Sequence, residues 1–195
     1  VFKLLNTDFE VKINEIPCEV RECRVSAIPF NRPWPGKQRP YNQSESAGFI
    51  SFSADEKVEI RVKRKQPFEK AFVRPLSKNV DVNIVNDEAV FILSEHGQYV
   101  LEFGNTHNAL HIFFNKVKEY PKAKDATVYF GSGIHFPGVI TLRDNDTVYI
   151  DEEAVVFGSI YSPGAKNVKI FGGGVLDNST EERITEHCYE NHTKG

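Results

Sequence analysis

The chain has 195 residues and a formal net charge of −3, with 40% hydrophobic, 26% charged and 12% aromatic residues. This composition is typical of a globular protein and excludes disordered, collagen-like and disulfide-dense classes. No apolar run approaches the roughly 18 residues that a membrane-spanning helix needs. The sequence pI near 6.1 gives no general attraction to nucleic acid or anionic lipid. We therefore expect neither nucleic acid nor a membrane as a partner.

Short strand-like segments follow one another through the first 120 residues. Residues such as Asn86-Asp87 and His96-Gly97 form turns between them. The segments are spaced about 8–12 residues apart without helical periodicity, which predicts an antiparallel β-sandwich over residues 1–120. The basic run Arg61 to Lys65 alternates with apolar residues, so a solvated outer strand face is favoured over a polyanion site. The segments span residues 9–13, 18–28, 49–54, 58–63, 71–73, 80–85, 89–93, 99–103 and 110–114.

The termini and cysteines give little information about the compartment. Val1 fits either removal of an initiator Met or a mature end after a signal peptide, and a secreted or periplasmic location is favoured over a cytoplasmic one. Cys18 and Cys23 are five residues apart in one strand-like segment, so their side chains are expected on opposite faces. Together with the distant Cys188, this spacing favours free thiols over one long-range disulfide.

A long loop from Phe30 to Ser46 contains three prolines and the only tryptophan. Trp34 and Tyr41 are candidates to stack on sugar rings, while Arg32 and Arg39 are candidates to bond hydroxyl groups. The alternative is an ordered loop that packs on its own sandwich or on a neighbouring domain. Both interpretations stay open at this point.

The sequence after residue 120 repeats with a period of twenty. Val128, Val148 and Val168 align, as do Phe130, Ile150 and Ile170. Further matches are Phe136 with Val156 and Leu176, Gly138 with Gly158, and Ile140 with Ile160, whereas outward residue types align as Tyr129, Tyr149 and Lys169. Alternation within a fixed period predicts coils of short strands stacked as a parallel β-helix over residues 121–195. Another antiparallel sheet with regular hairpins is the alternative.

The predicted coils span residues 127–146, 147–166 and 167–180, and the third gives way to a polar tail. Solenoids need about three repeats and a cap to bury their core. We therefore expect the β-helix to be incomplete in this sequence. An exposed end of such a helix is also a surface for association.

The chain resembles the β-helix glycoside hydrolases of families 28 and 49, which include polygalacturonases and dextranases. The resemblance lies in DATVYFGSGIHFPGVITLRDNDTVYIDEEAVVFGSI (residues 125–160) and NVKIFGGGVLDNS (residues 167–179). Upstream, WPGKQRPYNQSE, FVRPLS and NALHIFF are similar to the sandwich that precedes the helix in bacterial members. The resemblance implies an all-β chain, with an antiparallel sandwich followed by the first coils of a right-handed parallel β-helix.

The family's activity is hydrolysis of a glycosidic bond, usually with inversion, by carboxyl groups about 6.5–9.5 Å apart. Of its signatures, the Asp-Asp pair, Gly-His-Gly and Arg-Ile-Lys are missing, and Asn6-Thr7-Asp8 matches the first only by its letters. No catalytic residue is therefore assigned, and whether this chain alone is an enzyme stays uncertain. The implied function is the N-terminal portion of a hydrolase acting on a pectin- or glucan-type polysaccharide, with its aspartates downstream. The alternative is a non-catalytic carbohydrate-binding or adhesive β-helix module.

The sequence gives only weak support for other candidate sites. Asp177, at the end of a coil strand, is either a hydrogen-bonded corner residue or a sugar-binding or catalytic carboxylate. His107 and His111 lie on a strand rather than a helix, which disfavours a shared metal ion. Asp144-Asn145-Asp146 lacks the rest of a calcium loop and predicts a plain turn. We expect no metal and no cofactor, and a polysaccharide or oligosaccharide as the partner.

Overall fold

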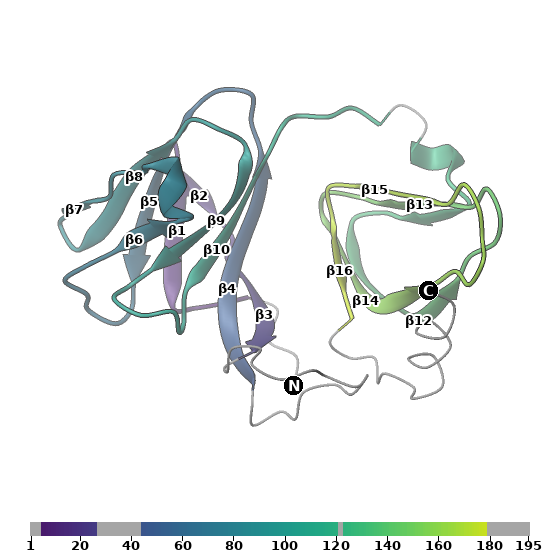
Figure 1. Ribbon diagram of the computed structural model, residues 1–195, viewed down its shortest axis with the longest axis horizontal. Helices are drawn as coiled ribbons and strands as arrows, with labels where there is room; N and C mark the ends of the chain where they lie inside the picture. Colours follow the sequence, from purple (N-terminus) through teal and green to yellow (C-terminus); the bar gives the residue numbers. More distant parts are fainter. Residues whose placement is uncertain (1–4, 27–43, 121–122, 179–195) are drawn as a thin grey trace. The chain divides into compact units, whose positions relative to one another are not determined.

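A computed structural model describes residues 5–26, 44–120 and 123–178 (Figure 1). Those residues are all-β, as predicted, and form two compact units, one of residues 5–26 and 44–118 and one of residues 119–178. In the described ranges the helical segments are two single turns, η2 (Leu76–Lys78) and η3 (Ala123–Asp125). No helix there is long and apolar enough to cross a membrane.

The N-terminal unit contains two five-stranded sheets. Sheet I has the order β2-β1-β5-β8-β7 and sheet II has the order β3-β4-β10-β9-β6. The strands are β1 (Phe9–Ile13), β2 (Ile16–Cys18), β3 (Arg21–Ser26), β4 (Ser44–Ser53), β5 (Val58–Arg64), β6 (Phe72–Arg74), β7 (Asn83–Val85), β8 (Glu88–Leu93), β9 (Gly97–Glu102) and β10 (Leu110–Asn115).

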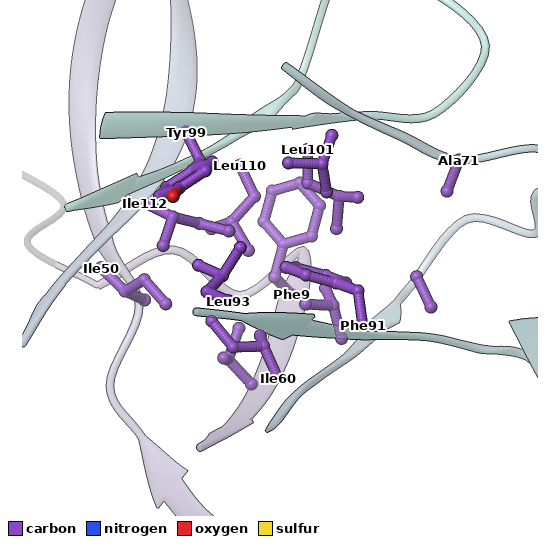
Figure 2. Close-up of a cluster of buried hydrophobic side chains, with 14 of the residues drawn as sticks. Phe9, Ile50, Ile60, Ala71, Phe91, Leu93, Tyr99, Leu101, Leu110 and Ile112 are labelled. Carbon is purple, nitrogen blue, oxygen red and sulfur yellow. The ribbon is translucent and has the colours of Figure 1, made fainter. Parts of the chain in front are cut away.

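One hydrophobic core joins the two sheets. Figure 2 shows Ile60 and Phe91 from sheet I beside Leu101 and Ile112 from sheet II. These side chains occupy alternate strand positions, because successive residues of a strand point to opposite faces. Burying large aliphatic and aromatic side chains contributes roughly 1.5–3 kcal/mol each, so this core is the main source of stability in the unit.

The outer face of β5 has the solvated character predicted for the basic run. The apolar residues at alternate positions of this strand are fully buried, whereas Lys63 is exposed. The Arg61 Nε lies 2.8 Å from an oxygen of Glu15 and 2.8 Å from an oxygen of Glu59. The charges of this face therefore pair with one another across the sheet surface.

Two details of the sandwich prediction were wrong. The segment predicted as one strand over residues 18–28 is divided, because the chain passes from β2 in sheet I to β3 in sheet II. Val20, at this crossing, is buried in the core. The sheets are also not purely antiparallel, since β4 and β10 run parallel and in register from Gly48–Leu110 to Ser53–Asn115. Five strands (β5 to β9) intervene between them in the chain, so no tight hairpin imposes an antiparallel direction.

Cys18 and Cys23 are free thiols, as predicted. The reason differs from the expected one, because the two residues lie in strands of different sheets. Burial raises the pKa of the Cys18 thiol, and the carboxylate of Glu19 adds to the shift. Cys18 is therefore a protonated, weakly nucleophilic side chain at neutral pH. Cys188 lies outside the described residues.

The C-terminal unit contains two three-stranded parallel sheets. Sheet III has the order β11-β13-β15 and sheet IV the order β12-β14-β16. We call β11 with β12 layer 1, β13 with β14 layer 2, and β15 with β16 layer 3; Figure 1 labels β12 to β16. The strands are β11 (Val128–Phe130), β12 (Gly133–Thr141), β13 (Thr147–Ile150), β14 (Ala154–Tyr161), β15 (Lys169–Gly172) and β16 (Val175–Asp177). Parallel neighbours exclude the antiparallel hairpin alternative for these strands.

The period of twenty describes the contact between layers 1 and 2 in most positions. Val128 pairs with Val148 and Phe130 with Ile150, and Gly138 pairs with Gly158 and Ile140 with Ile160. The predicted match of Phe136 with Val156 was wrong by one residue. His135 pairs with Val156 instead, because the register shifts between His135 and Gly138.

The predicted register of layer 3 in sheet III was wrong by two residues. Val148 pairs with Ile170 and Ile150 with Gly172, so Val168 and Ile170 are not the partners that a strict period of twenty predicts. The physical reason is turn length. Five residues (142–146) join β12 to β13, whereas seven (162–168) join β14 to β15. In sheet IV the predicted register returns, and Val156 pairs with Leu176.

Asparagine side chains align these unequal turns. Asn145 and Asn167 both adopt the left-handed backbone conformation, with φ values of 67° and 59°. The side-chain amide of Asn167 donates a hydrogen bond of 3.2 Å to the Asn145 side-chain oxygen. Asparagine tolerates this conformation because its short polar side chain bonds locally. Layers 2 and 3 are thus joined at a corner as well as along their strands.

The inward side chains of the C-terminal unit are more deeply buried in layer 2 than in layer 3. Val148 and Val156 are fully buried between strands of layers 1 and 3. Their register partners in layer 3, Ile170 and Leu176, are 53% and 38% exposed. The inward side chains of layer 3 therefore retain an uncovered apolar face.

Candidate functional site

The structure describes the position of one of the five predicted sugar-binding residues. Arg32, Trp34, Arg39 and Tyr41 lie outside the described residues, so the interpretation of their loop stays a prediction. Asp177 is the last residue of β16 and is partly exposed. The candidate site extends from Asp177 over the surface of sheets III and IV.

Asp177 continues a row of aromatic side chains across sheet IV. It pairs in register with Phe157 of β14, which is buried. The ring of Phe157 stacks on that of Phe136, with centroids 5.2 Å apart and planes 12° apart. Phe136 itself is 67% exposed. The row therefore presents an open aromatic surface at one end and a carboxylate at the other.

A second aromatic row lies on sheet III. Tyr129 stacks on Tyr149 with centroids 5.4 Å apart, and Tyr149 contacts Phe171 at 5.4 Å. Tyr120 packs against both Tyr149 and Phe171 at 5.7 Å. Phe171 was not predicted as a member of this row, because a strict period of twenty aligns Lys169 with Tyr149. The signal that identifies Phe171 is the two-residue longer turn before β15.

Desolvation raises the pKa of the Tyr149 phenol, and the negative charge of Asp151 adds to that shift. Tyr149 therefore keeps its proton through the physiological pH range and offers a hydroxyl donor beside the rings. Aromatic faces with adjacent hydroxyl or carboxyl groups suit the apolar faces and hydroxyl edges of sugars. This chemistry is binding rather than bond cleavage.

The acidic residues near these rows take part in turns. The Asp151 side chain accepts a hydrogen bond of 3.1 Å from the Glu153 backbone N–H, and Glu153 accepts one of 2.9 Å from the Ser132 hydroxyl. The turn predicted at Asp144-Asn145-Asp146 is confirmed. Asp146 accepts a bond of 2.7 Å from the Arg143 backbone N–H, and Asp144 accepts one of 2.8 Å from the Lys166 backbone N–H.

The two histidines considered for metal binding have separate environments. The Nδ1 atom of His107 lies 2.8 Å from a carboxylate oxygen of Glu45. His111 lies on β10, where it pairs in register with Phe49 of β4 and with Val100 of β9. Within the part of the chain that the structure describes, no three His, Cys, Asp or Glu side chains gather as a metal site. Both histidines belong to the N-terminal unit, whereas the aromatic rows belong to the C-terminal unit.

His111 gives the N-terminal unit a pH dependence. Burial lowers the pKa of His111 below its ordinary value of 6.5, so the unfolded chain binds this proton at a higher pH than the folded chain does. Stability therefore declines as the pH falls below about 6.5. We expect a lower urea midpoint at pH 5 than at pH 8, and a smaller difference in a His111→Gln variant. Comparing the two proteins at pH 8 separates lost packing from protonation. An equal pH effect in both proteins would exclude His111 as its source.

Comparison with known proteins finds similarity of structure but not of sequence. No protein-family model matches the chain, and no curated protein sequence matches it. Among solved structures, the chain is similar to Dex49A from Penicillium minioluteum, with a TM-score of 0.61 and 15% sequence identity. The superposition covers 93% of this chain and 49% of Dex49A, so the chain spans about half the length of that protein. The chain therefore shares an all-β fold with about half of Dex49A.

Proposed function

We propose that the chain is the N-terminal portion of a polysaccharide-processing glycoside hydrolase. In this proposal residues 1–120 form a β-sandwich, and residues 121–195 begin a right-handed parallel β-helix. The observation that carries the proposal is the likeness to Dex49A, a dextranase of glycoside hydrolase family 49, over 93% of the chain. The parallel pairing of three successive layers in both sheets supports the same architecture.

We place the catalytic carboxylates of the parent protein in coils that follow this chain. Inverting hydrolysis uses two carboxyl groups about 6.5–9.5 Å apart, one as acid and one as base. Asp177 is the carboxylate at the end of the sheet IV row. Asp151 accepts a hydrogen bond within its own turn, and Glu153 accepts one from Ser132 in layer 1. The uncovered side chains of Ile170 and Leu176 support a further coil over layer 3, because such a coil would bury them.

The substrate in this proposal is a glucan- or pectin-type polysaccharide, and the likeness to a dextranase favours a glucan. The aromatic rows on sheets III and IV support contact with sugar rings. They leave the linkage that is cleaved undefined, since stacking on a ring face does not distinguish one glycosidic bond from another.

A hydrolysis assay tests the function. The 195-residue chain is incubated with dextran, polygalacturonate and pectin beside the product of the complete reading frame that contains it. We expect reducing sugar from the complete product only, with inversion of the anomeric configuration seen by NMR. Release by the 195-residue chain alone would contradict the placement of the carboxylates. Saccharide binding without hydrolysis by the complete product would favour the carbohydrate-binding or adhesive module instead.

A further inference from the structure

A pocket of about 390 Å³ lies beside β8 of sheet I in the N-terminal unit, and the core residues Phe91 and Tyr99 also line it. Its floor is formed by Val90 and Ile92 of β8, and the segment from Lys78 to Asn83 forms one wall. Ile92 is 51% exposed and lies on β8 beyond the residues that pair with β7. A volume of this size lies within the range of small-ligand sites, roughly 300–1,000 Å³.

The wall supplies polar groups that are free to bind. Asn79, Asp81 and Asn83 all line the pocket and are exposed. Among the described residues, no side-chain hydrogen bond or ion pair engages Asp81 or Asn83. Asn79 closes η2 in the left-handed conformation with a φ of 47°, and its backbone N–H bonds to the Leu76 carbonyl, so its position in the wall is fixed. Two amides and a carboxylate thus surround an apolar floor.

The charges at the rim are paired in the structure. Lys78 forms an ion pair with Glu95, and Glu59 accepts a hydrogen bond of 2.8 Å from Arg61. Among the described residues, Asp81 is the charged lining residue without an ion pair. An anionic ligand would meet this carboxylate, whereas a neutral polyol can donate hydroxyl protons to it.

The rim is held in place by a buried tyrosine. The Tyr99 hydroxyl donates a hydrogen bond of 2.6 Å to the Glu95 backbone carbonyl, and its ring belongs to the core. This bond ties the turn between β8 and β9 to the hydrophobic core. The pocket is therefore a preformed feature of the sheet, which reduces the entropic cost of binding.

We propose that this pocket binds a neutral saccharide, with the pyranose C–H face on Val90 and Ile92 and the hydroxyl groups on Asn79, Asp81 and Asn83. The inference rests on the proposed polysaccharide-processing function and narrows it to neutral, glucan-type chains. The N-terminal unit then serves as an accessory binding unit. It holds the polymer while another part of the protein cleaves it.

Titration of the ¹⁵N-labelled 195-residue chain tests the proposal by NMR. The probes are isomaltotriose, which is neutral, and trigalacturonate, which is anionic. We expect isomaltotriose to cause saturable shifts of the side-chain amides of Asn79 and Asn83, and trigalacturonate to leave them unchanged. Absence of saturable shifts, or equal shifts with both probes, would overturn the proposal. Shifts caused by spermine but not by isomaltotriose would assign the pocket to a cation and would also overturn it.

Matched variants locate the binding. We expect Asp81→Ala and Ile92→Ala each to weaken isomaltotriose binding about tenfold, which corresponds to the loss of one charge-assisted hydrogen bond or a comparable apolar contact. Asp55→Ala and Ile16→Ala, at exposed positions that do not line the pocket, are the controls and should bind like the parent. Equal weakening by the controls would contradict the location.

The accessory site and the proposed hydrolase function fail independently. If the complete protein hydrolyses soluble glucan and Asp81→Ala leaves isomaltotriose binding intact, the pocket assignment is wrong and the function stands. If isomaltotriose binds the pocket and the complete protein hydrolyses no polysaccharide, the function is wrong and the pocket stands as a lectin-like site.

Discussion

Replacing Val148 with aspartate is expected to destabilise the C-terminal unit by on the order of 4 kcal/mol. Val148 is fully buried in layer 2, with Val128 on one side and Ile170 on the other. A carboxylate at this position loses its hydration and meets apolar neighbours. The expected result is loss of the cooperative unfolding transition of this unit in a urea titration followed by circular dichroism.

The matched control is Val139→Asp, which makes the same change on β12 of the same unit. Val139 is 46% exposed, so the introduced carboxylate keeps its water. We expect this variant to unfold within about 0.5 kcal/mol of the parent, as surface substitutions usually do. If Val148→Asp and Val139→Asp unfold alike, the inward register of β13 is wrong.

The second large effect is expected at Gly172, at the end of β15. Its φ is +124°, and an added Cβ would lie 1.9 Å from the Ile150 backbone oxygen. Gly172→Ala therefore combines an unfavourable backbone conformation with a clash against backbone, and we expect a loss of about 3–5 kcal/mol. Thermal unfolding of the variant measures the loss.

Substitution of Gly133 distinguishes the cost of backbone conformation from the cost of the steric clash. Its φ is +119°, close to that of Gly172, but an added Cβ there would meet no atom within 4 Å. We expect Gly133→Ala to cost about 1 kcal/mol from conformation alone. Equal losses at the two positions would mean that layer 3 does not approach Ile150 as closely as the structure shows.

These glycines also explain how layer 3 regains its register. Four residues (151–154) separate Ile150 from Val155, whereas Gly173 and Gly174 alone separate their partners Gly172 and Val175. The shorter corner offsets the longer turn at residues 162–168. It brings layer 3 against layer 2 so closely that an added Cβ on Gly174 would lie 2.1 Å from the Asp151 carbonyl oxygen. The run of three glycines is thus a consequence of close backbone approach.

Alternation of side chains was predictable because it depends on neighbouring residues alone. The inward positions Val148 and Ile150 and the outward Tyr149 were identified from a pattern of period two. The same holds for β5, where basic residues alternate with buried valine and isoleucine. Alternation identifies the face of a side chain but not the strand beside it.

Strand partners were less predictable, because they depend on the whole path of the chain. The parallel contact of β4 with β10 joins residues about sixty apart, and no local signal specifies it. The same limit affected the candidate site, where a two-residue difference in turn length replaced Lys169 by Phe171 in the aromatic row. The pocket combines residues from β5, β7, β8, β9 and the turns around them, and none of these residues was predicted as a site from the sequence.

The sequence by itself determined the all-β class, the inward and outward faces of the strands, and the stacking of successive segments about twenty residues apart. These properties follow from local alternation and from spacing along the chain. The tertiary structure decided the register of layer 3, the third member of the aromatic row and the position of the pocket. Each of these depends on how turns of unequal length and strands distant in the chain pack together, since backbone hydrogen bonds pair any two strands and side-chain packing selects among them.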